Sequence, residues 1–226
     1  MKTLECRGIT LSDKQTKICV PITGTDLEEI KEQAEKIANM NPDVVEWRAD
    51  FYDVKNNDET EFEQCLKAIN DNLKNIPIIY TYRTSNEGGE KSIDVDDYCR
   101  LCKYVSEISE KYNVAMIDVE LYENKDRKDI GKWLLDIKST GVKVIGSNHH
   151  FEGTPSEKDI FNVLKTMEEA GADICKIAVM PKEKVDVKTL INASKKANKE
   201  LNAPIITMSM GELGAVTRIC HRKPRR

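Results

Sequence analysis

Short apolar runs rich in β-branched residues recur along the chain, and each is followed by a stretch with the pattern of a helix. Strands that read as continuous apolar runs and alternate with helices are typical of a parallel sheet covered by helices. The runs start about 31 residues apart, which suits a strand–helix repeat. We therefore expect seven strands, within residues 17–23, 43–48, 77–83, 114–120, 142–148, 173–180 and 204–210.

Seven such units predict an α/β fold of the (β/α)8 TIM-barrel type, in which an eighth strand would begin near residue 235. The sequence has 226 residues, so we expect the eighth βα unit to be lacking. A doubly wound open sheet is the alternative, and such sheets usually carry a glycine-rich phosphate turn after the first strand. The corresponding turn, 21–25, reads PITGT and has no G-x-G-x-x-G pattern, which favours the barrel.

Helix boundaries can be placed from their terminal residues. Thr25 with Glu28, and Thr154 with Glu157, match the capping-box pattern at the start of a helix. Two glycines stand where helices should end in a left-handed cap before the next strand: Gly141 and Gly171.

The composition, with 39% hydrophobic and 33% charged residues, supports one sizeable core. We expect a single domain over residues 1–226, with an atypical basic tail at 219–226. No apolar run is long enough for a membrane span, and the first ten residues lack the apolar segment of a signal peptide. These features predict a cytoplasmic protein without a membrane partner.

The seven cysteines and the net charge of −4 narrow the function classes further. Disulfide frameworks belong mainly to small secreted domains, so we expect free thiols in a reducing compartment. An acidic chain gives no sign of a nucleic-acid surface, and no such partner is expected. A solvated end is the usual interpretation of the basic tail, which carries Arg222, Lys223, Arg225 and Arg226.

In barrels of this type the active site lies at the carboxyl ends of the strands, so polar residues at those positions are the candidates. Lys176 is the most informative, because it lies among apolar neighbours in the sixth expected strand. Desolvation of an amine favours its neutral form, which can attack a carbonyl. A lysine ion-paired to a strand carboxylate is the alternative. The remaining candidates are Glu46, Arg48, Arg83, Asp118, Glu120, His149, His150 and Arg218.

His149 ends the strand before that of Lys176, which predicts an acid–base group beside a nucleophilic amine. A hydrogen-bonded structural histidine is the alternative. Adjacent residues of a strand point to opposite faces, so His149 and His150 are not expected to bind one metal ion. The sequence thus predicts a site without a metal.

Arginines at three strand ends, in a net acidic protein, predict a locally positive mouth suited to a carboxylate or phosphate. Glu46 points to the same side of its strand as Arg48 and is expected to orient that guanidinium. A ring of salt bridges around the top of the barrel is the alternative. The segment 87–90, which reads EGGE, is expected to be a flexible loop over the mouth.

Six motifs, taken in order and at their spacing, resemble those of type I 3-dehydroquinate dehydratases. The resemblance extends from about residue 17 to Arg218. The motifs are EWRAD at 46–50, YTYR at 80–83 followed by EGGE at 87–90, IDVE at 117–120, SNH at 147–149, KIAVMP at 176–181 and ITMSM at 206–210.

The resemblance implies a lyase that dehydrates 3-dehydroquinate to 3-dehydroshikimate, in the shikimate pathway that leads to the aromatic amino acids. In such enzymes Lys176 would form an imine with the C3 ketone, and His149 would remove a C2 proton and protonate the departing C1 hydroxyl. The family uses no metal or organic cofactor and commonly forms homodimers. The other residues implied are Glu46, Trp47, Arg48, Arg83 and Arg218, which would bind the substrate, and Glu87 and Asp118, which would support the histidine.

The sequence departs from the family after Arg218, where a helix, an eighth strand, a closing loop and a last helix are expected. Three functions therefore compete: an active dehydratase, a non-catalytic or strongly impaired ligand-binding remnant, and another Schiff-base enzyme of the aldolase type. The first two share every motif, whereas an aldolase would need a different set of residues at the strand ends.

Overall fold

The computed structural model describes residues 2–12, 15–53, 58–121 and 129–219 of the chain. The predicted basic tail lies outside these residues, apart from Ile219. Two compact units can be distinguished. The N-terminal unit comprises residues 3–119 and 132–144, and the C-terminal unit comprises residues 1–2, 120–131 and 145–226. The single domain expected from the composition stays a prediction.

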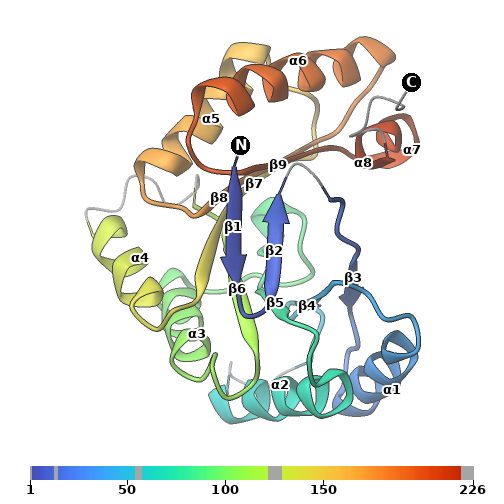
Figure 1. Ribbon diagram of the computed structural model, residues 1–226, viewed down its shortest axis with the longest axis vertical. Coiled ribbons are helices and arrows are strands. Elements are labelled where there is room, and N and C mark those ends of the chain that lie inside the picture. The colour runs from blue at the N-terminus through green and yellow to red at the C-terminus, as the bar shows by residue number, and fades with distance from the viewer. Residues whose placement is uncertain (1, 13–14, 54–57, 122–128, 220–226) are drawn as a thin grey trace. The chain divides into compact units, whose positions relative to one another are not determined.

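Four parallel strands form the sheet of the N-terminal unit, and they are paired in the order in which they occur along the chain. These strands are β3 (Cys19–Ile22), β4 (Val44–Arg48), β5 (Ile78–Thr81) and β6 (Val114–Val119). The helices that alternate with them are α1 (Leu27–Ala38), α2 (Glu59–Leu73), α3 (Val95–Glu107) and α4 (Ile130–Lys138), and a short 3-10 helix, η1, spans Ser85–Glu87 (Figure 1).

A β-hairpin that the sequence reading did not predict precedes these strands. It consists of β1 (Thr3–Cys6) and β2 (Ile9–Ser12), which pair in antiparallel register. Arg7, in the turn, donates hydrogen bonds from Nε to the carbonyl of Val114 at 2.9 Å and from Nη2 to Ser109 Oγ at 3.1 Å. The hairpin is therefore tied to the amino end of β6, opposite to the end where a barrel places its chemistry.

The C-terminal unit repeats the same alternation. Its strands are β7 (Lys143–His150, which belongs to this unit from Ile145 on), β8 (Ile174–Val179) and β9 (Ile205–Ser209), and they are parallel and paired in chain order. Helix α5 (Glu157–Glu169) packs against β8, and α6 (Lys184–Glu200) packs against β9. Two short helices follow β9, namely α7 (Gly211–Gly214) and α8 (Val216–Ile219).

All seven predicted strands are present, and within each unit their order follows the chain. A doubly wound sheet would instead reverse its strand order after the first strands. In the N-terminal unit the strand order is β3-β4-β5-β6, the order of neighbouring strands around a (β/α)8 barrel. The strand pairing therefore supports the barrel and not the open alternative.

The register of the N-terminal sheet separates two faces. Ile22, Trp47, Tyr80 and Ile117 lie in register across the four strands, and each of them has a fully buried side chain. Trp47 packs against Tyr80 and against Phe62 of α2, with ring centroids 5.7 Å apart in both pairs. This row therefore belongs to the core between sheet and helices, and the alternate residues of each strand face the other side.

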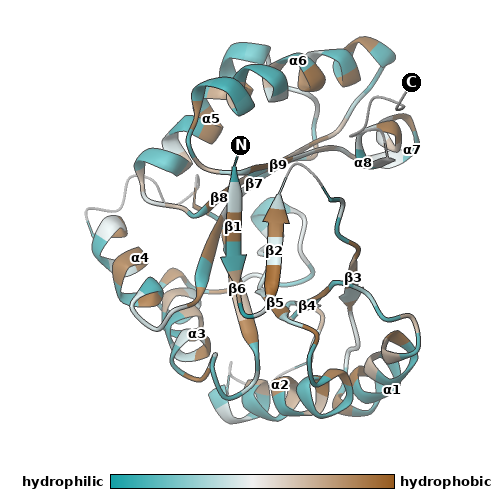
Figure 2. Cartoon of the chain, viewed as in Figure 1, coloured by the Kyte–Doolittle hydropathy of each residue, from teal (hydrophilic) through white to brown (hydrophobic). Residues whose placement is uncertain are grey.

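Surface helices carry hydrophilic and hydrophobic residues along the same helix, as Figure 2 shows for α1, α5 and α6. In α1, for example, Ile30, Ala34 and Ile37 are buried at helical spacing. None of the helices in the described parts of the chain is long and apolar enough to cross a membrane.

Two helices begin later than predicted. The N-cap of α1 is Asp26, whose side chain accepts from the Glu29 amide, and Glu29 in turn accepts from the amide of Thr25. The N-cap of α5 is Ser156, whose hydroxyl accepts from the Asp159 amide. In both cases a second capping-competent residue lies downstream of the threonine that was chosen. The predicted glycine caps are confirmed, because Gly141 and Gly171 have φ values of 88° and 100°.

Candidate active site

Polar side chains of the N-terminal unit converge on the sheet face opposite the aromatic core. Arg48, Thr81 and Asp118 lie in register at the carboxyl ends of β4, β5 and β6. Glu46 lies on the same face two residues before Arg48, and its Oε1 accepts a 2.8 Å hydrogen bond from Thr81 Oγ1. Strand periodicity alone thus brings together the side chains that the sequence singled out at these three strand ends.

Arg83 is held between two carboxylates. Its Nη2 donates to Asp118 Oδ1 at 2.6 Å, and its Nη1 donates to Glu87 Oε2 at 3.2 Å. Arg83, Glu87 and Asp118 are 4%, 1% and 1% exposed. Charges so deeply buried persist only when paired, so this triad is a fixed electrostatic unit of the fold.

Asp50, which was not predicted, is the partner of Arg48. Arg48 Nε and Nη2 donate to Asp50 Oδ1 and Oδ2 at 2.8 and 2.7 Å, the two-pronged geometry of a strong arginine–carboxylate pair. The sequence assigned the orientation of this guanidinium to Glu46, and that assignment needs correction. Asp50, which binds two of the guanidinium nitrogens, lies after the end of β4, where the backbone turns and directs the carboxylate back toward Arg48.

Two further expectations for this unit change. Trp47, predicted to bind substrate, lies in the helix-facing core, because it alternates with Glu46 and Arg48 along β4. The predicted positive mouth is also absent from the described residues of this cluster: Arg48 and Arg83 are both ion-paired, in accord with the salt-bridge alternative. Four carboxylates accompany the two arginines, namely Glu46, Asp50, Glu87 and Asp118.

The segment between β5 and α3 is anchored at several points and does not form the free loop expected. The amide of Gly89 donates to the carbonyl of Thr84 at 2.8 Å. A Cβ at Gly89 would lie 1.8 Å from the carbonyl oxygen of Arg83, so only glycine fits this close approach. Lys91 Nζ donates to the carbonyl of Tyr52 at 2.6 Å, which ties the end of the segment to the chain after β4.

Tyrosines near this cluster are poor acid–base candidates. Burial raises the pKa of Tyr82 to about 12 and also raises the pKa of the fully buried Tyr80 well above its usual value. Both phenols therefore stay protonated at neutral pH.

In the C-terminal unit, Lys176 and His149 share one face of the sheet. Lys176 lies in register with Ser147 of β7, and His149 follows Ser147 by two residues on the same strand. Lys176 is partly exposed, whereas every other residue of β8 is buried. Its side chain is therefore not fully enclosed by the apolar core. The register thus places Lys176 and His149 on the same face of neighbouring strands, and His150 points to the other face. Their roles as amine nucleophile and acid–base group stay a prediction.

Arg218 lies on α8 and is exposed. The position of α8 is fixed through Thr217, whose hydroxyl accepts from the Ser209 amide at 3.1 Å and donates to the Gly214 carbonyl at 2.7 Å. A Cβ at Gly214 would lie 2.0 Å from the carbonyl oxygen of Ser209, so α7 packs directly on the end of β9. These contacts hold Arg218 just beyond the carboxyl end of β9.

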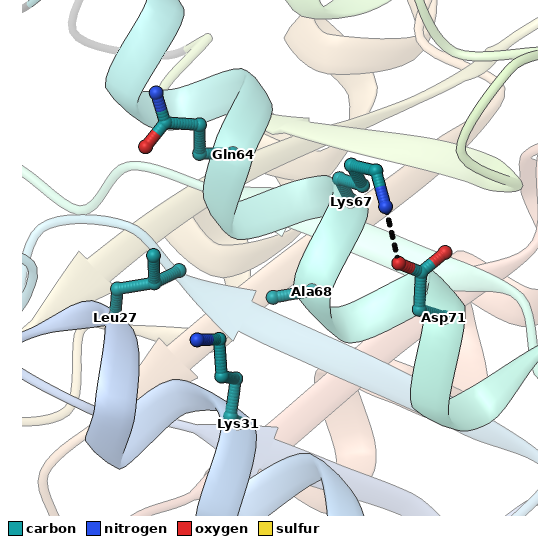
Figure 3. A pocket seen from close by; sticks show the side chains of 6 residues that line it. All are labelled: Leu27, Lys31, Gln64, Lys67, Ala68 and Asp71. Atoms are coloured by element: carbon teal, nitrogen blue, oxygen red, sulfur yellow. Dashed lines mark hydrogen bonds and ion pairs between the residues drawn. The ribbon is translucent and has the colours of Figure 1, made fainter.

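A groove of about 210 Å³ lies between α1 and α2. Figure 3 shows Leu27 and Lys31 of α1 facing Gln64, Lys67, Ala68 and Asp71 of α2, with Lys67 paired to Asp71. Its charged groups come from exposed helix surfaces, and none of the residues implied by the motifs lines it. We therefore do not assign it to the active site.

Sequence comparison identifies relatives over nearly the whole chain. A 3-dehydroquinate dehydratase of Listeria monocytogenes is 37% identical over 220 residues, which cover 97% of this chain and 84% of the relative. The 3-dehydroquinate dehydratase of Clostridium novyi is also 37% identical, with 97% and 85% coverage.

Structural comparison agrees. The 3-dehydroquinate dehydratase of Geobacillus kaustophilus superimposes with a TM-score of 0.90 at 31% identity, over 97% of this chain and 83% of that one. A type I enzyme of Clostridium difficile, solved with covalently modified comenic acid, gives a TM-score of 0.89 at 36% identity, over 97% and 85%. These matches confirm the predicted α/β barrel class. The profile of the type I 3-dehydroquinase family matches residues 18–224, and the chain belongs to that family.

Proposed function

We propose that this chain dehydrates 3-dehydroquinate to 3-dehydroshikimate through an imine on Lys176. The observation that carries the proposal is the common face of Lys176 and His149 on neighbouring strands. A nucleophilic amine with an acid–base group beside it is the arrangement that Schiff-base chemistry requires. Family membership and relatives named 3-dehydroquinate dehydratase support this reaction over that of an aldolase.

The proposed reaction passes through an iminium and an enamine on Lys176. The Lys176 amine adds to the C3 ketone, and loss of water from the carbinolamine gives the iminium. His149 removes a C2 proton, and the electron pair flows into the iminium to form an enamine. Return of that pair expels the C1 hydroxyl, which takes a proton from His149 and leaves as water. Hydrolysis of the conjugated iminium releases the product and restores the amine.

The remaining residues are proposed to bind the substrate or to position other groups. Glu46, Arg48 and Arg218 supply acceptors and donors for the hydroxyls and the carboxylate. Arg83 has both of its terminal nitrogens in buried ion pairs, so we assign it to holding Glu87 and Asp118 in place. Those two carboxylates are proposed as supporting groups of the site.

We also propose a cytoplasmic homodimer that has no nucleic-acid partner. The net charge of −4 argues against a polyanion surface. Phe151, Val185 and Ile191 of the C-terminal unit are large apolar side chains with 37% or more exposure, and a second subunit would remove apolar side chains of this kind from water. Sedimentation equilibrium would determine the stoichiometry.

Trapping of the imine tests the central proposal. Incubation with 3-dehydroquinate and sodium borohydride should reduce the iminium to a stable secondary amine on the peptide that contains Lys176. Lys176→Met should yield no adduct and no turnover, whereas Lys182→Met, which removes an exposed lysine from the same unit, should give the full adduct. An adduct on a different lysine would refute the assignment.

A further inference from the structure

Asp50 is fully buried just past the carboxyl end of β4, and each of its carboxylate oxygens accepts two hydrogen bonds. Oδ1 accepts from Arg48 Nε at 2.8 Å and from the Arg83 amide at 3.2 Å. Oδ2 accepts from Arg48 Nη2 at 2.7 Å and from the Glu90 amide at 3.2 Å. One carboxylate thus joins a guanidinium from β4 to both ends of the segment 83–90.

The ion pair with Asp50 uses Nε and Nη2 of Arg48 and leaves Nη1 available to a ligand. Two fork bonds to Asp50 fix the plane of the guanidinium, and the Phe51 ring lies 4.9 Å from the guanidinium carbon. Within the described parts of the chain, Nη1 of Arg48 has no acceptor. The side chain is 23% exposed, so Nη1 can donate to a ligand in one fixed direction.

The two backbone contacts act on the other side of the carboxylate. The Arg83 amide belongs to the residue that grips Glu87 and Asp118, and the Glu90 amide follows the tight approach at Gly89. Asp50 therefore sets the position of the ion-paired triad relative to Arg48. Loss of its charge would release both at once.

We propose that Asp50 is a positioning residue of the dehydratase, which orients Arg48 toward the oxygens of the substrate and fixes the segment carrying Arg83 and Glu87 against it. This inference rests on the proposed function, because it takes Arg48 as a substrate-binding residue. It adds a residue that acts through Arg48 without touching the substrate.

The primary test is Asp50→Asn, which keeps the shape but can no longer accept both prongs of the fork. We expect the kcat/KM for 3-dehydroquinate to fall at least tenfold, mainly through KM, while borohydride still labels Lys176 at saturating substrate. Asp43→Asn is the matched control, since Asp43 lies at the amino end of β4 and accepts from Lys17 Nζ and the Ile18 amide. It should leave KM unchanged. An Asp50→Asn enzyme with wild-type kcat/KM would overturn the proposal.

A double-mutant cycle separates positioning from general stability. If Asp50 acts largely through Arg48, then Asp50→Asn should lower kcat/KM by clearly fewer fold in the Arg48→Ala background than in the wild type, because coupled residues are not additive. Full additivity would contradict the proposal. Should Asp50→Asn not fold, Arg48→Lys decides, because lysine keeps the charge without the fork. Wild-type kcat/KM in Arg48→Lys would then refute the role of the fork.

Different measurements would contradict the Schiff-base function and the positioning role of Asp50. A wild-type protein that gives no Lys176 adduct contradicts the Schiff-base function, whatever Asp50 does. A wild-type adduct together with unchanged kinetics in Asp50→Asn contradicts only the positioning role.

Discussion

Lys176 and His149 face the same side of the sheet from neighbouring strands, with His149 two residues nearer the carboxyl ends. That offset places the imidazole on the side from which a ligand reaches the amine in a barrel. His150 occupies the next position of β7 but points to the opposite face, so the two histidines form a natural pair for comparison.

His149→Ala should lower kcat by roughly 10²- to 10⁴-fold, the usual contribution of a general acid–base group. His150→Ala, which changes the same strand on its other face, should lower kcat much less. Steady-state kinetics with 3-dehydroquinate measure both. Equal losses in the two variants would show that His149 has a structural role only.

Arg218→Ala should raise KM by about 10- to 150-fold, because one charge-assisted hydrogen bond contributes about 1.5–3 kcal/mol. Trapping of Lys176 at saturating substrate should persist. Lys199→Ala removes an exposed cation from the last turn of α6 and serves as the control for a general loss of positive charge. If both variants raise KM alike, Arg218 acts through long-range attraction and does not contact the substrate.

Trp47→Ala should lower the free energy of unfolding by about 3–5 kcal/mol, since it opens a cavity in a fully buried aromatic cluster. Trp47→Phe should cost less, because the indole Nε1 has no hydrogen-bond partner among the residues that the structure describes. Urea titration gives both values, and KM should be unchanged in Trp47→Phe. A raised KM with normal stability would return Trp47 to the substrate-binding residues.

Gly89→Ala should destabilise the protein by about 1–3 kcal/mol and raise KM, because the added methyl group collides with the Arg83 carbonyl and displaces the segment that Asp50 anchors. Gly131→Ala is the matched control. Its added methyl group, in helix α4, has no described atom outside the helix within 4 Å, so the change should stabilise the protein by about 0.5–1 kcal/mol. A neutral Gly89→Ala would show that the segment adapts freely.

The strands were predictable because their apolar runs are long, bounded and evenly spaced, and all seven occur where expected. The position of hairpin β1–β2 was not, since Arg7 attaches it to Ser109 and Val114, which lie over a hundred residues away in the sequence. The helix starts were misplaced because Asp26 and Ser156 compete as N-caps with the threonines before them, and only the folded backbone shows which oxygen reaches an amide.

The candidate site was predictable where strand periodicity decides it, as for Lys176 with His149. Trp47 is buried in the helix-facing core, a placement that its alternation with Glu46 and Arg48 along β4 already indicates, so its substrate-binding role rests on the motif alone. Asp50 was not predicted because it lies beyond the strand, where strand periodicity no longer places side chains. Its separation of two residues from Arg48 is the sequence signal that could have indicated an ion pair.

The alternation of Arg48 and Trp47 on β4 also constrains how the chain can fold. A slip of β4 by one residue against β5 would send the guanidinium into the aromatic core and the indole among the carboxylates. Each error costs an unpaired buried charge or an exposed aromatic surface, so misaligned pairings of this strand are strongly disfavoured. The alternation of charged and aromatic residues along β4 thus also specifies the correct strand pairing as the sheet forms.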